Sequence, residues 1–191
     1  RMDNSSNQSA EAIAFGMVDP QVVDNWTLSW SGTQQLGTSS HDGAYGVAVD
    51  SSGNVYAAGH TAGALDGSSA GGDDLFVVKY NSSGTKQWTK QLGTSSTDQG
   101  FGVTVDSSDN IYVVGSTKGG MDNNTNSGGW DFFLVKYNSS GTKQWTQQLG
   151  TSSDDSGKGV TVDSSNNIYV TGYIEGGLDG NTNSGNYDIF L

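Results

Sequence analysis

Two loops rich in Asp and Asn have the residue spacing most typical of metal chemistry in this chain. In each loop, oxygen-bearing side chains stand at the first, third and fifth positions, and another Asp follows nine residues after the first. This spacing resembles loops that wrap a Ca²⁺ ion, a hard cation bound by oxygen ligands. The candidate ligands are Asp122, Asn124, Asn126 and Asp131 in one loop, and Asp179, Asn181, Asn183 and Asp188 in the other.

An ordinary turn is the alternative for both loops. The helix-flanked calcium loop has Gly at its sixth position and Glu at its twelfth, and neither loop has them. Asn and Asp are also the commonest turn formers, because their side chains bond to nearby backbone groups. The equivalent upstream loop is one residue shorter and carries Asp66, Ser68 and Ala70, which predicts weak calcium binding or none. The sequence thus leaves two alternatives open: the protein binds calcium, or it has no cofactor.

Catalytic chemistry is not indicated by any motif. His41 and His60 are the only histidines, and they form no zinc-binding pattern. The chain lacks a G-x-S-x-G elbow and a glycine-rich phosphate loop. Its Ser- and Asp-rich turns recur by duplication, whereas a catalytic triad needs one asymmetric set of residues. We therefore expect that the protein is not an enzyme.

The charge balance excludes several classes of partner. Twenty acidic and eight basic residues give a net charge of −12, whereas binding to nucleic-acid phosphates needs clustered Lys and Arg. No apolar run has the length of a membrane span, and there is no cysteine for disulfides. The first 20 residues lack the apolar core of a signal peptide, so we interpret them as a mature or truncated N-terminus or a cloning remnant. We expect no nucleic-acid partner and no membrane insertion.

An internal repeat dominates the sequence. GVAVDSSGNVYAAG at 46–59 returns as GVTVDSSDNIYVVG at 102–115 and as GVTVDSSNNIYVTG at 159–172. The segment DLFVVKYNSSGTKQWTKQLGTSS at 74–96 recurs, nearly unchanged, at 131–153. A period of 56 to 57 residues predicts one supersecondary unit that is copied and stacked, because no single unit buries its own apolar face.

Each unit has a hydrophobic period of two, which predicts strands rather than helices. In the first copy we expect strands near 47–50, 54–59, 74–80 and 85–92, joined by tight turns. The first turn places Gly53, Asp109 or Asn166 where a positive φ is needed, and these residue types tolerate it best. The predicted fold class is all-β, a β-propeller built of four-stranded antiparallel blades.

The motif V-x-V-D-S-S-x-N-[IV]-Y-V-x-G, followed by D-x-F-[VL]-V-K-Y-N-S-S-G-T-K-Q-W, resembles the bacterial β-propeller repeat (SBBP repeat) family. The resemblance covers residues 26–191. It implies radially arranged blades in secreted or surface-exposed bacterial proteins, and it brings no general catalytic motif.

The strand count predicts about three blades' worth of structure per chain. Residues 1–25 are interpreted as an extension or linker, 26–36 as a lone closing strand, 46–92 and 102–149 as two blades, and 159–191 as a partial third. Propellers normally have four to eight blades. We therefore expect either a homodimer that closes a six-bladed ring or further blades in a longer parent chain.

Some residues recur with the repeat and have both structural and functional interpretations. Asp42, Asp98 and Asp155 are expected to fix turns through backbone N–H groups rather than to form repeated ligand sites. The recurring aromatic residues are expected to pack between blades rather than to stack on sugars; they are Tyr56, Tyr112, Tyr169, Trp88 and Trp145.

Binding residues are expected where the repeats disagree within a shared frame, because a rigid scaffold carries function on variable positions. We place these positions in the connections between strands. They are His41, Tyr45, His60, Phe101, Ser116, Lys158 and Tyr173.

The sequence favours a non-enzymatic, secreted or surface-exposed propeller module that serves as a binding or structural scaffold for a protein or glycan. The alternatives are a calcium-dependent or carbohydrate-binding lectin-like propeller, and an accessory domain of a hydrolase.

Overall fold

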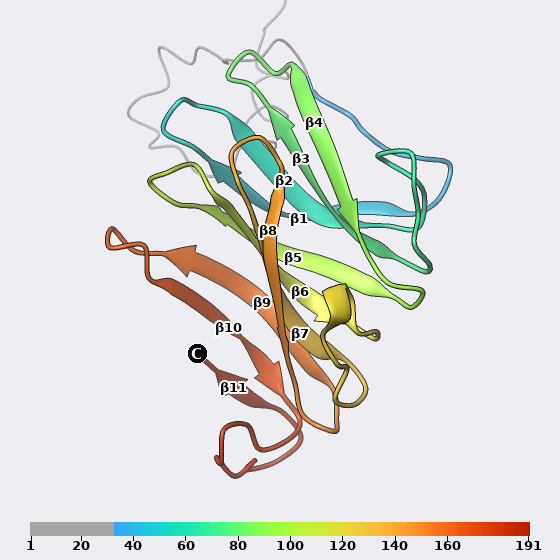
Figure 1. Cartoon of the computed structure of the whole chain (residues 1–191), viewed down its shortest axis with the longest axis vertical. Coiled ribbons are helices and arrows are strands. Elements are labelled where there is room, and N and C mark those ends of the chain that lie inside the picture. Colours follow the sequence, from blue (N-terminus) through green and yellow to red (C-terminus); the bar gives the residue numbers. More distant parts are fainter. Residues whose placement is uncertain (1–32) are drawn as a thin grey trace, which may run out of the picture.

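The computed structural model describes residues 33–191, which form three antiparallel β-sheets arranged one after another along the molecule (Figure 1). We call these sheets blades 1, 2 and 3. Blade 1 contains β1 (Asp42–Val49), β2 (Val55–Thr61), β3 (Asp74–Tyr80) and β4 (Lys86–Leu92). Blade 2 contains β5 (Asp98–Val105), β6 (Ile111–Thr117), β7 (Asp131–Tyr137) and β8 (Lys143–Leu149). Blade 3 contains β9 (Asp155–Val162), β10 (Ile168–Ile174) and β11 (Asp188–Phe190). A single-turn 3₁₀ helix, η2 (Met121–Asn123), precedes β7. The expected all-β fold with four-stranded antiparallel sheets is confirmed.

The first hairpin of each blade turns as the sequence predicts. Its turn residue has a positive φ in all three copies, 76° at Gly53, 60° at Asp109 and 64° at Asn166. The Asp that opens the turn braces it: Asp106 Oδ1 accepts hydrogen bonds from the backbone N–H groups of Ser108 and Asn110, at 2.8 and 2.9 Å. Asp106 Oδ2 accepts a hydrogen bond from the Tyr112 hydroxyl at 3.0 Å. The turn and the strand that follows it are thereby tied together.

The main hydrophobic core lies between blades 1 and 2. Side chains of β2 and β3 meet those of β6 and β7, and Val77, Val113 and Phe133 are fully buried there. The recurring aromatic residues of blades 1 and 2 pack inside the protein, since Tyr56, which belongs to this core, and Tyr112 are both buried. Their ring centroids lie 6.0 Å from Trp88 and 6.1 Å from Trp145, respectively. The expectation that these residues pack rather than bind sugar is confirmed in blades 1 and 2.

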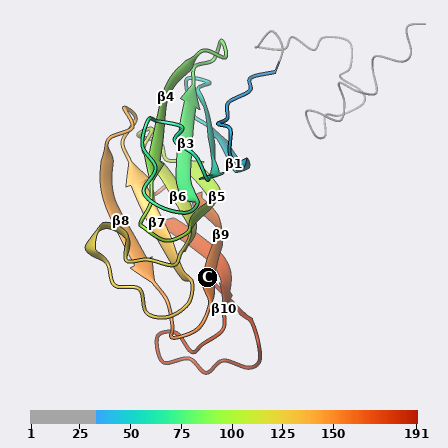
Figure 2. The ribbon, with the colours of Figure 1, turned by 90° about the vertical axis from the view of Figure 1, so that its right-hand side faces the viewer.

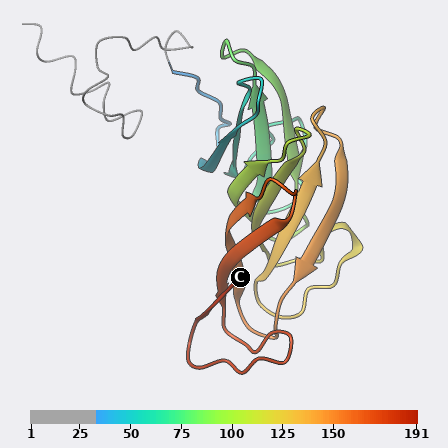
Figure 3. The ribbon, with the colours of Figure 1, turned by 90° about the vertical axis from the view of Figure 1, so that its left-hand side faces the viewer.

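The first strands of the blades are neighbours, since β5 contacts both β1 and β9. We call β1, β5 and β9 the inner strands; β4 and β8 run along the opposite side of the molecule (Figures 2 and 3). The inner strands begin at Asp42, Asp98 and Asp155, several residues before the predicted starts. The physical reason is a β-bulge in each, beyond which pairing with the next strand resumes.

The predicted extension over 1–25 lies outside the described residues, and so does most of the predicted closing strand over 26–36. Residues 33–36 are described and form no strand. Leu36 nevertheless packs against Phe76, Val78 and Tyr80 on the outer face of blade 1. Its repeat equivalent, Leu92, packs in the same manner into the core between blades 1 and 2.

Candidate binding site

The three β-bulges bring together positions where the repeats differ. In each bulge one residue has no partner on the neighbouring strand, and this residue is Tyr45 in β1, Phe101 in β5 and Lys158 in β9. Bulges re-aim a side chain and are common beside functional sites. The frame around them is the same in every blade: a glycine on the adjacent strand lies so close that a Cβ on Gly115 would collide with the Gln99 carbonyl oxygen.

These unpaired residues form a continuous row across the blades. Tyr45 stacks on His60 with 4.8 Å between ring centroids and 13° between the ring planes. Its ring also meets Phe101 edge-on at 5.9 Å, and Phe101 meets His60 at 6.2 Å. Offset and edge-on contacts at such distances stabilise aromatic pairs. We call Tyr45, His60, Phe101, Ser116, Lys158 and Tyr173 the inner-edge row.

Lys158 joins the aromatic part of the row to blade 3. Its Nζ lies 3.4 Å from the centroid of the Phe101 ring and 5.5 Å from that of Tyr173. Loss of hydration at this position lowers the pKa of the Lys158 ammonium. The side chain is still exposed to solvent, and among residues 33–191 no carboxylate forms an ion pair with it. The row therefore carries one accessible cation held against two aromatic rings.

His60 is the buried member of the row and is only 5% exposed. Burial lowers its pKa, although the Asp73 carboxylate and a hydrogen bond with the Gly100 backbone act in the opposite direction. Its Nδ1 is buried and has no hydrogen-bond partner. A buried polar atom without a partner is costly and needs an explanation. The Tyr45 ring, which is 55% exposed, covers this histidine.

The remaining predicted positions are Ser116 and His41. Ser116 is buried, and its Oγ is hydrogen-bonded to Ser156 Oγ of blade 3 at 2.5 Å. His41 lies beside β1, with its ring centroid 5.9 Å from that of His60. The prediction that these positions occupy connections between strands is wrong for every one except His41. Tyr45, for example, lies inside β1, because the bulge lets the strand start at Asp42.

A further set of positions also differs between the repeats and was not among the predicted binding residues. Asp73, Trp130 and Tyr187 hold the same place in the three repeats, immediately before the third strand of each blade. Tyr187 meets Tyr173 edge-on with 4.7 Å between ring centroids, which extends the inner-edge row. The signal was present in the sequence, since three different residues stand in one frame next to an unchanging Asp.

The recurring Asp at the start of each inner strand fixes the connection before it, as expected. Asp98 Oδ2 accepts a hydrogen bond from the Thr94 backbone N–H at 2.6 Å and one from the Thr94 hydroxyl at 3.0 Å. The Thr117 hydroxyl donates to the other oxygen. Burial of Asp98 is strong enough to raise its pKa in spite of these donors. The same arrangement recurs at Asp42.

The Asp- and Asn-rich loops form internal hydrogen bonds. In blade 2, Asp122 pairs with Lys143 and Thr146, whereas Asp131 Oδ2 accepts from the Ser127 N–H at 2.8 Å. The Asn124 and Asn126 amides donate to backbone carbonyls. In blade 3 the amides of Asn181 and Asn183 do the same, and Asp188 accepts from the Ser184 N–H. Among residues 33–191 no group of three or more His or carboxylate side chains is placed to hold a metal ion. The calcium hypothesis stays a prediction.

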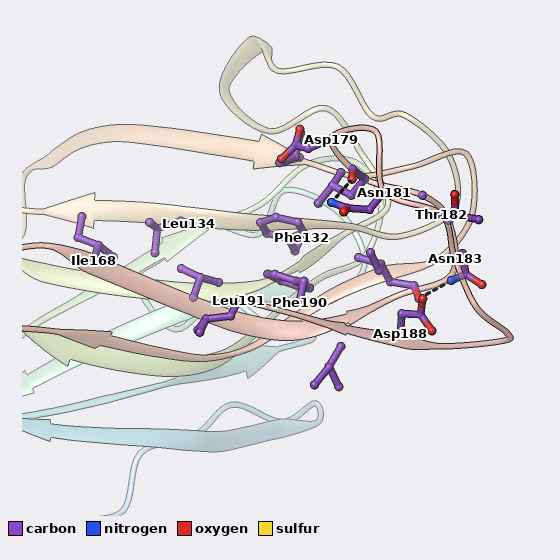
Figure 4. Close-up of a pocket in the computed structure, with 17 residues that line it drawn as sticks. Phe132, Leu134, Ile168, Asp179, Asn181, Thr182, Asn183, Asp188, Phe190 and Leu191 are labelled. Carbon is purple, nitrogen blue, oxygen red and sulfur yellow. Dashed lines mark hydrogen bonds between the residues drawn. The ribbon is translucent and has the colours of Figure 1, made fainter.

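A cavity of about 620 Å³ opens between blades 2 and 3 (Figure 4). Phe132, Leu134 and Leu149 line it from blade 2, and Ile168, Val170 and Phe190 line it from blade 3. In the tighter interface between blades 1 and 2, the equivalent space is filled by Val135 and Tyr137, at the end of β7. Strand β11 ends at Phe190, before these positions. The cavity therefore lies where, among residues 33–191, blade 3 has no counterpart of Val135 and Tyr137.

The fold and the repeating frame define a β-propeller repeat protein. Residues 32–65, 87–120 and 144–179 each match the β-propeller repeat family known as SBBP. The chain belongs to this family.

Two proteins to which the chain is similar are much longer than the chain. The chain is 33% identical, over 124 residues, to an uncharacterized WD repeat-containing protein, L264, of Acanthamoeba polyphaga mimivirus; the match covers 56% of this chain and 9% of that protein. It is 28% identical, over 148 residues, to the regulatory protein FlaEY of Caulobacter vibrioides, with 69% and 16% covered. The chain thus spans less than a fifth of either relative. Within residues 33–191, no helix is long and apolar enough to cross a membrane.

Proposed function

We propose that this chain is a non-enzymatic β-propeller module that binds its ligand at the inner-edge row. One observation carries the proposal: residues that differ between otherwise matching repeats come together in space and present aromatic rings and a cation to solvent. The recurring carboxylates, in contrast, are engaged in turns. Function on a propeller resides at such variable positions of a rigid frame.

The module is proposed to act outside the cell or at its surface, where the ligand is a protein or a glycan. The match to the SBBP repeat family supports this setting, because that resemblance implies secreted or surface-exposed proteins. A secretion assay on the full parent protein tests the location, because accumulation in the cytoplasm would contradict it.

The binding proposal is tested with a panel of immobilised glycans and peptides. The wild-type chain is compared with a Tyr45→Ala, Phe101→Ala double variant, and with a Gln87→Ala control on the exposed outer strand β4. We expect the wild type and the control to bind at least one member of the panel. The double variant should no longer bind that member. Equal retention by all three chains, or no retention by the wild type, would refute a binding role for the row.

A second proposal concerns assembly and rests on unequal exposure of equivalent residues. Val103 is 8% exposed between blades 1 and 2, whereas its counterpart Val47 is 70% exposed. Tyr56 is fully buried in the same interface, whereas its counterpart Tyr169 is 44% exposed. Within residues 33–191, the two halves of one interface thus lie at opposite ends, and neither half is covered by another blade. We propose that they meet when a second copy closes the ring, or when further blades of the parent protein continue it.

Light scattering tests this assembly on the isolated chain. We expect twice the chain mass of 19.9 kDa, and we expect Val47→Asp to prevent association because it places a charge in the interface. A monodisperse monomer of the wild-type chain would contradict closure by a second copy.

A further inference from the structure

We propose that the inner-edge row binds a sugar that carries a carboxylate, such as a uronic acid unit of a glycan. The inference rests on the proposed binding function and assigns the class of ligand. It combines three features of the row: exposed aromatic rings, an unpaired lysine and a buried polar atom without a partner.

The aromatic rings supply a surface for the apolar face of a pyranose ring. Tyr45 is 55% exposed and Tyr187 is 59% exposed, and Phe101 and Tyr173 lie between them along the row. Large aromatic side chains with a polar tip contact a ligand that is apolar on one face and hydroxylated at its edge. Single exposed aromatic residues are unremarkable, but four in a row across three blades form a platform.

Lys158 supplies the charge that selects a carboxylate. Its ammonium lies against the rings of Phe101 and Tyr173, and among residues 33–191 no carboxylate forms an ion pair with it. A charge-assisted hydrogen bond to a partly desolvated ammonium is among the stronger polar contacts. The chain as a whole carries a charge of −12. That field disfavours a polyanion, but within roughly one Debye length of about 8 Å the local cation attracts a single carboxylate.

Hydrogen-bonding groups behind the rings match sugar hydroxyls. The His60 Nδ1 has no partner beneath the Tyr45 ring, and the Ser116 and Ser156 hydroxyls form a pair at the next blade. A hydroxyl both donates and accepts, so it satisfies either tautomer of a neutral histidine. Binding would require the Tyr45 side chain to rotate away from His60, which its exposed position allows.

The backbone of the row argues against an extended acidic peptide. Such a peptide binds an exposed strand edge through a regular ladder of main-chain hydrogen bonds. Each inner strand is interrupted by a bulge at the row itself, at Tyr45, Phe101 and Lys158. A bulge breaks the ladder and disfavours pairing in register. A ligand that binds through side chains is therefore favoured.

Calorimetry on the whole chain with methyl glucuronide and methyl glucoside tests the proposal, since the two probes differ by the carboxylate. We expect the glucuronide to bind at least about tenfold more tightly, the size of one charge-assisted hydrogen bond. Lys158→Met should remove this difference, whereas Lys86→Met on exposed β4 should retain it. His60→Phe should weaken the binding of both probes.

The outcomes separate this inference from the proposed function. Equal affinity for the two probes, or a preference that survives in Lys158→Met, overturns the carboxylate assignment. Stronger binding of an acetylated aspartate amide than of the glucuronide overturns the sugar assignment in favour of a peptide. In both cases, a loss of panel binding in the Tyr45→Ala, Phe101→Ala variant would still support the row as the binding site.

Discussion

Replacing Thr117 by Val removes one hydroxyl from the buried clamp at the start of β5 and changes its volume little. In the structure, the Thr117 Oγ1 donates to Asp98 Oδ1 and accepts from the Gly119 N–H at 2.9 Å. Asp98 and Thr117 are both fully buried. The valine leaves Asp98 Oδ1 with a single, longer bond of 3.3 Å from the Thr94 hydroxyl. An unsatisfied buried polar group costs about 1–3 kcal/mol, and two groups are affected. We expect a loss of about 3 kcal/mol in the free energy of unfolding.

The repeat supplies matched controls for this substitution. Thr61 makes the same bonds in blade 1, but Asp42 there is partly exposed, and water replaces the lost donor. We expect Thr61→Val to cost about 1 kcal/mol. In blade 3 the position is Ile174, and Asp155 Oδ1 is buried without a hydrogen-bond partner. Ile174→Thr should therefore be more stable than the isosteric Ile174→Val by about 1–2 kcal/mol.

Urea unfolding followed by tryptophan fluorescence and circular dichroism measures these differences. The Thr117→Val deficit should also depend on pH. Burial raises the pKa of Asp98 above its unfolded value, and loss of a donor raises it further. Ionised Asp98 is the form that the folded state disfavours, so the deficit should be largest at neutral pH and shrink as pH falls toward about 4. If Thr61→Val and Thr117→Val lowered the free energy of unfolding equally, the hydrogen bond from the threonine to the buried carboxylate would not be the source of the effect.

Three further predictions concern the bulge, the histidine and the loops. Gly115→Ala should destabilise the chain by about 2–3 kcal/mol in urea unfolding, because the new Cβ would collide with the Gln99 carbonyl oxygen. Gly185→Ala is the control: its Cβ would meet no atom within 4 Å, so it should be nearly neutral. Burial lowers the pKa of His60, so the stability that the neutral form contributes is complete above about 6.5 and is lost as pH falls through the folded pKa; His60→Gln should flatten the stability profile between pH 7 and 5. The calcium hypothesis predicts heat on addition of millimolar Ca²⁺: Asp122→Ala and Asp179→Ala should each remove one site, whereas Asp66→Ala should leave the heat unchanged. A calorimeter trace without heat assigns these loops to ordinary turns.

The sequence by itself determined the local architecture, because that depends on neighbours along the chain. Period-two alternation places β3 at the predicted residues 74–80, since side chains of a strand alternate between faces. Gly53, Asp109 and Asn166 adopt the positive φ that their residue types predict, because the cost of that conformation depends on the residue itself. The repeat of 56 to 57 residues also predicted that successive sheets would bury one another's faces.

Only the tertiary structure decided how the variable positions meet. The bulges were not predicted, because a bulge depends on the register with the neighbouring strand, and register is a contact between segments. Glycines at 59, 115 and 172 were a signal, since a glycine inside a strand often marks a close approach of backbone. The contact among Tyr45, Phe101 and Lys158 also could not be predicted from the periodicity of the sequence. These residues are separated by 56 and 57 positions, and their distance follows from how tightly the glycine-rich inner strands stack. That packing depends on the shapes of three blades at once.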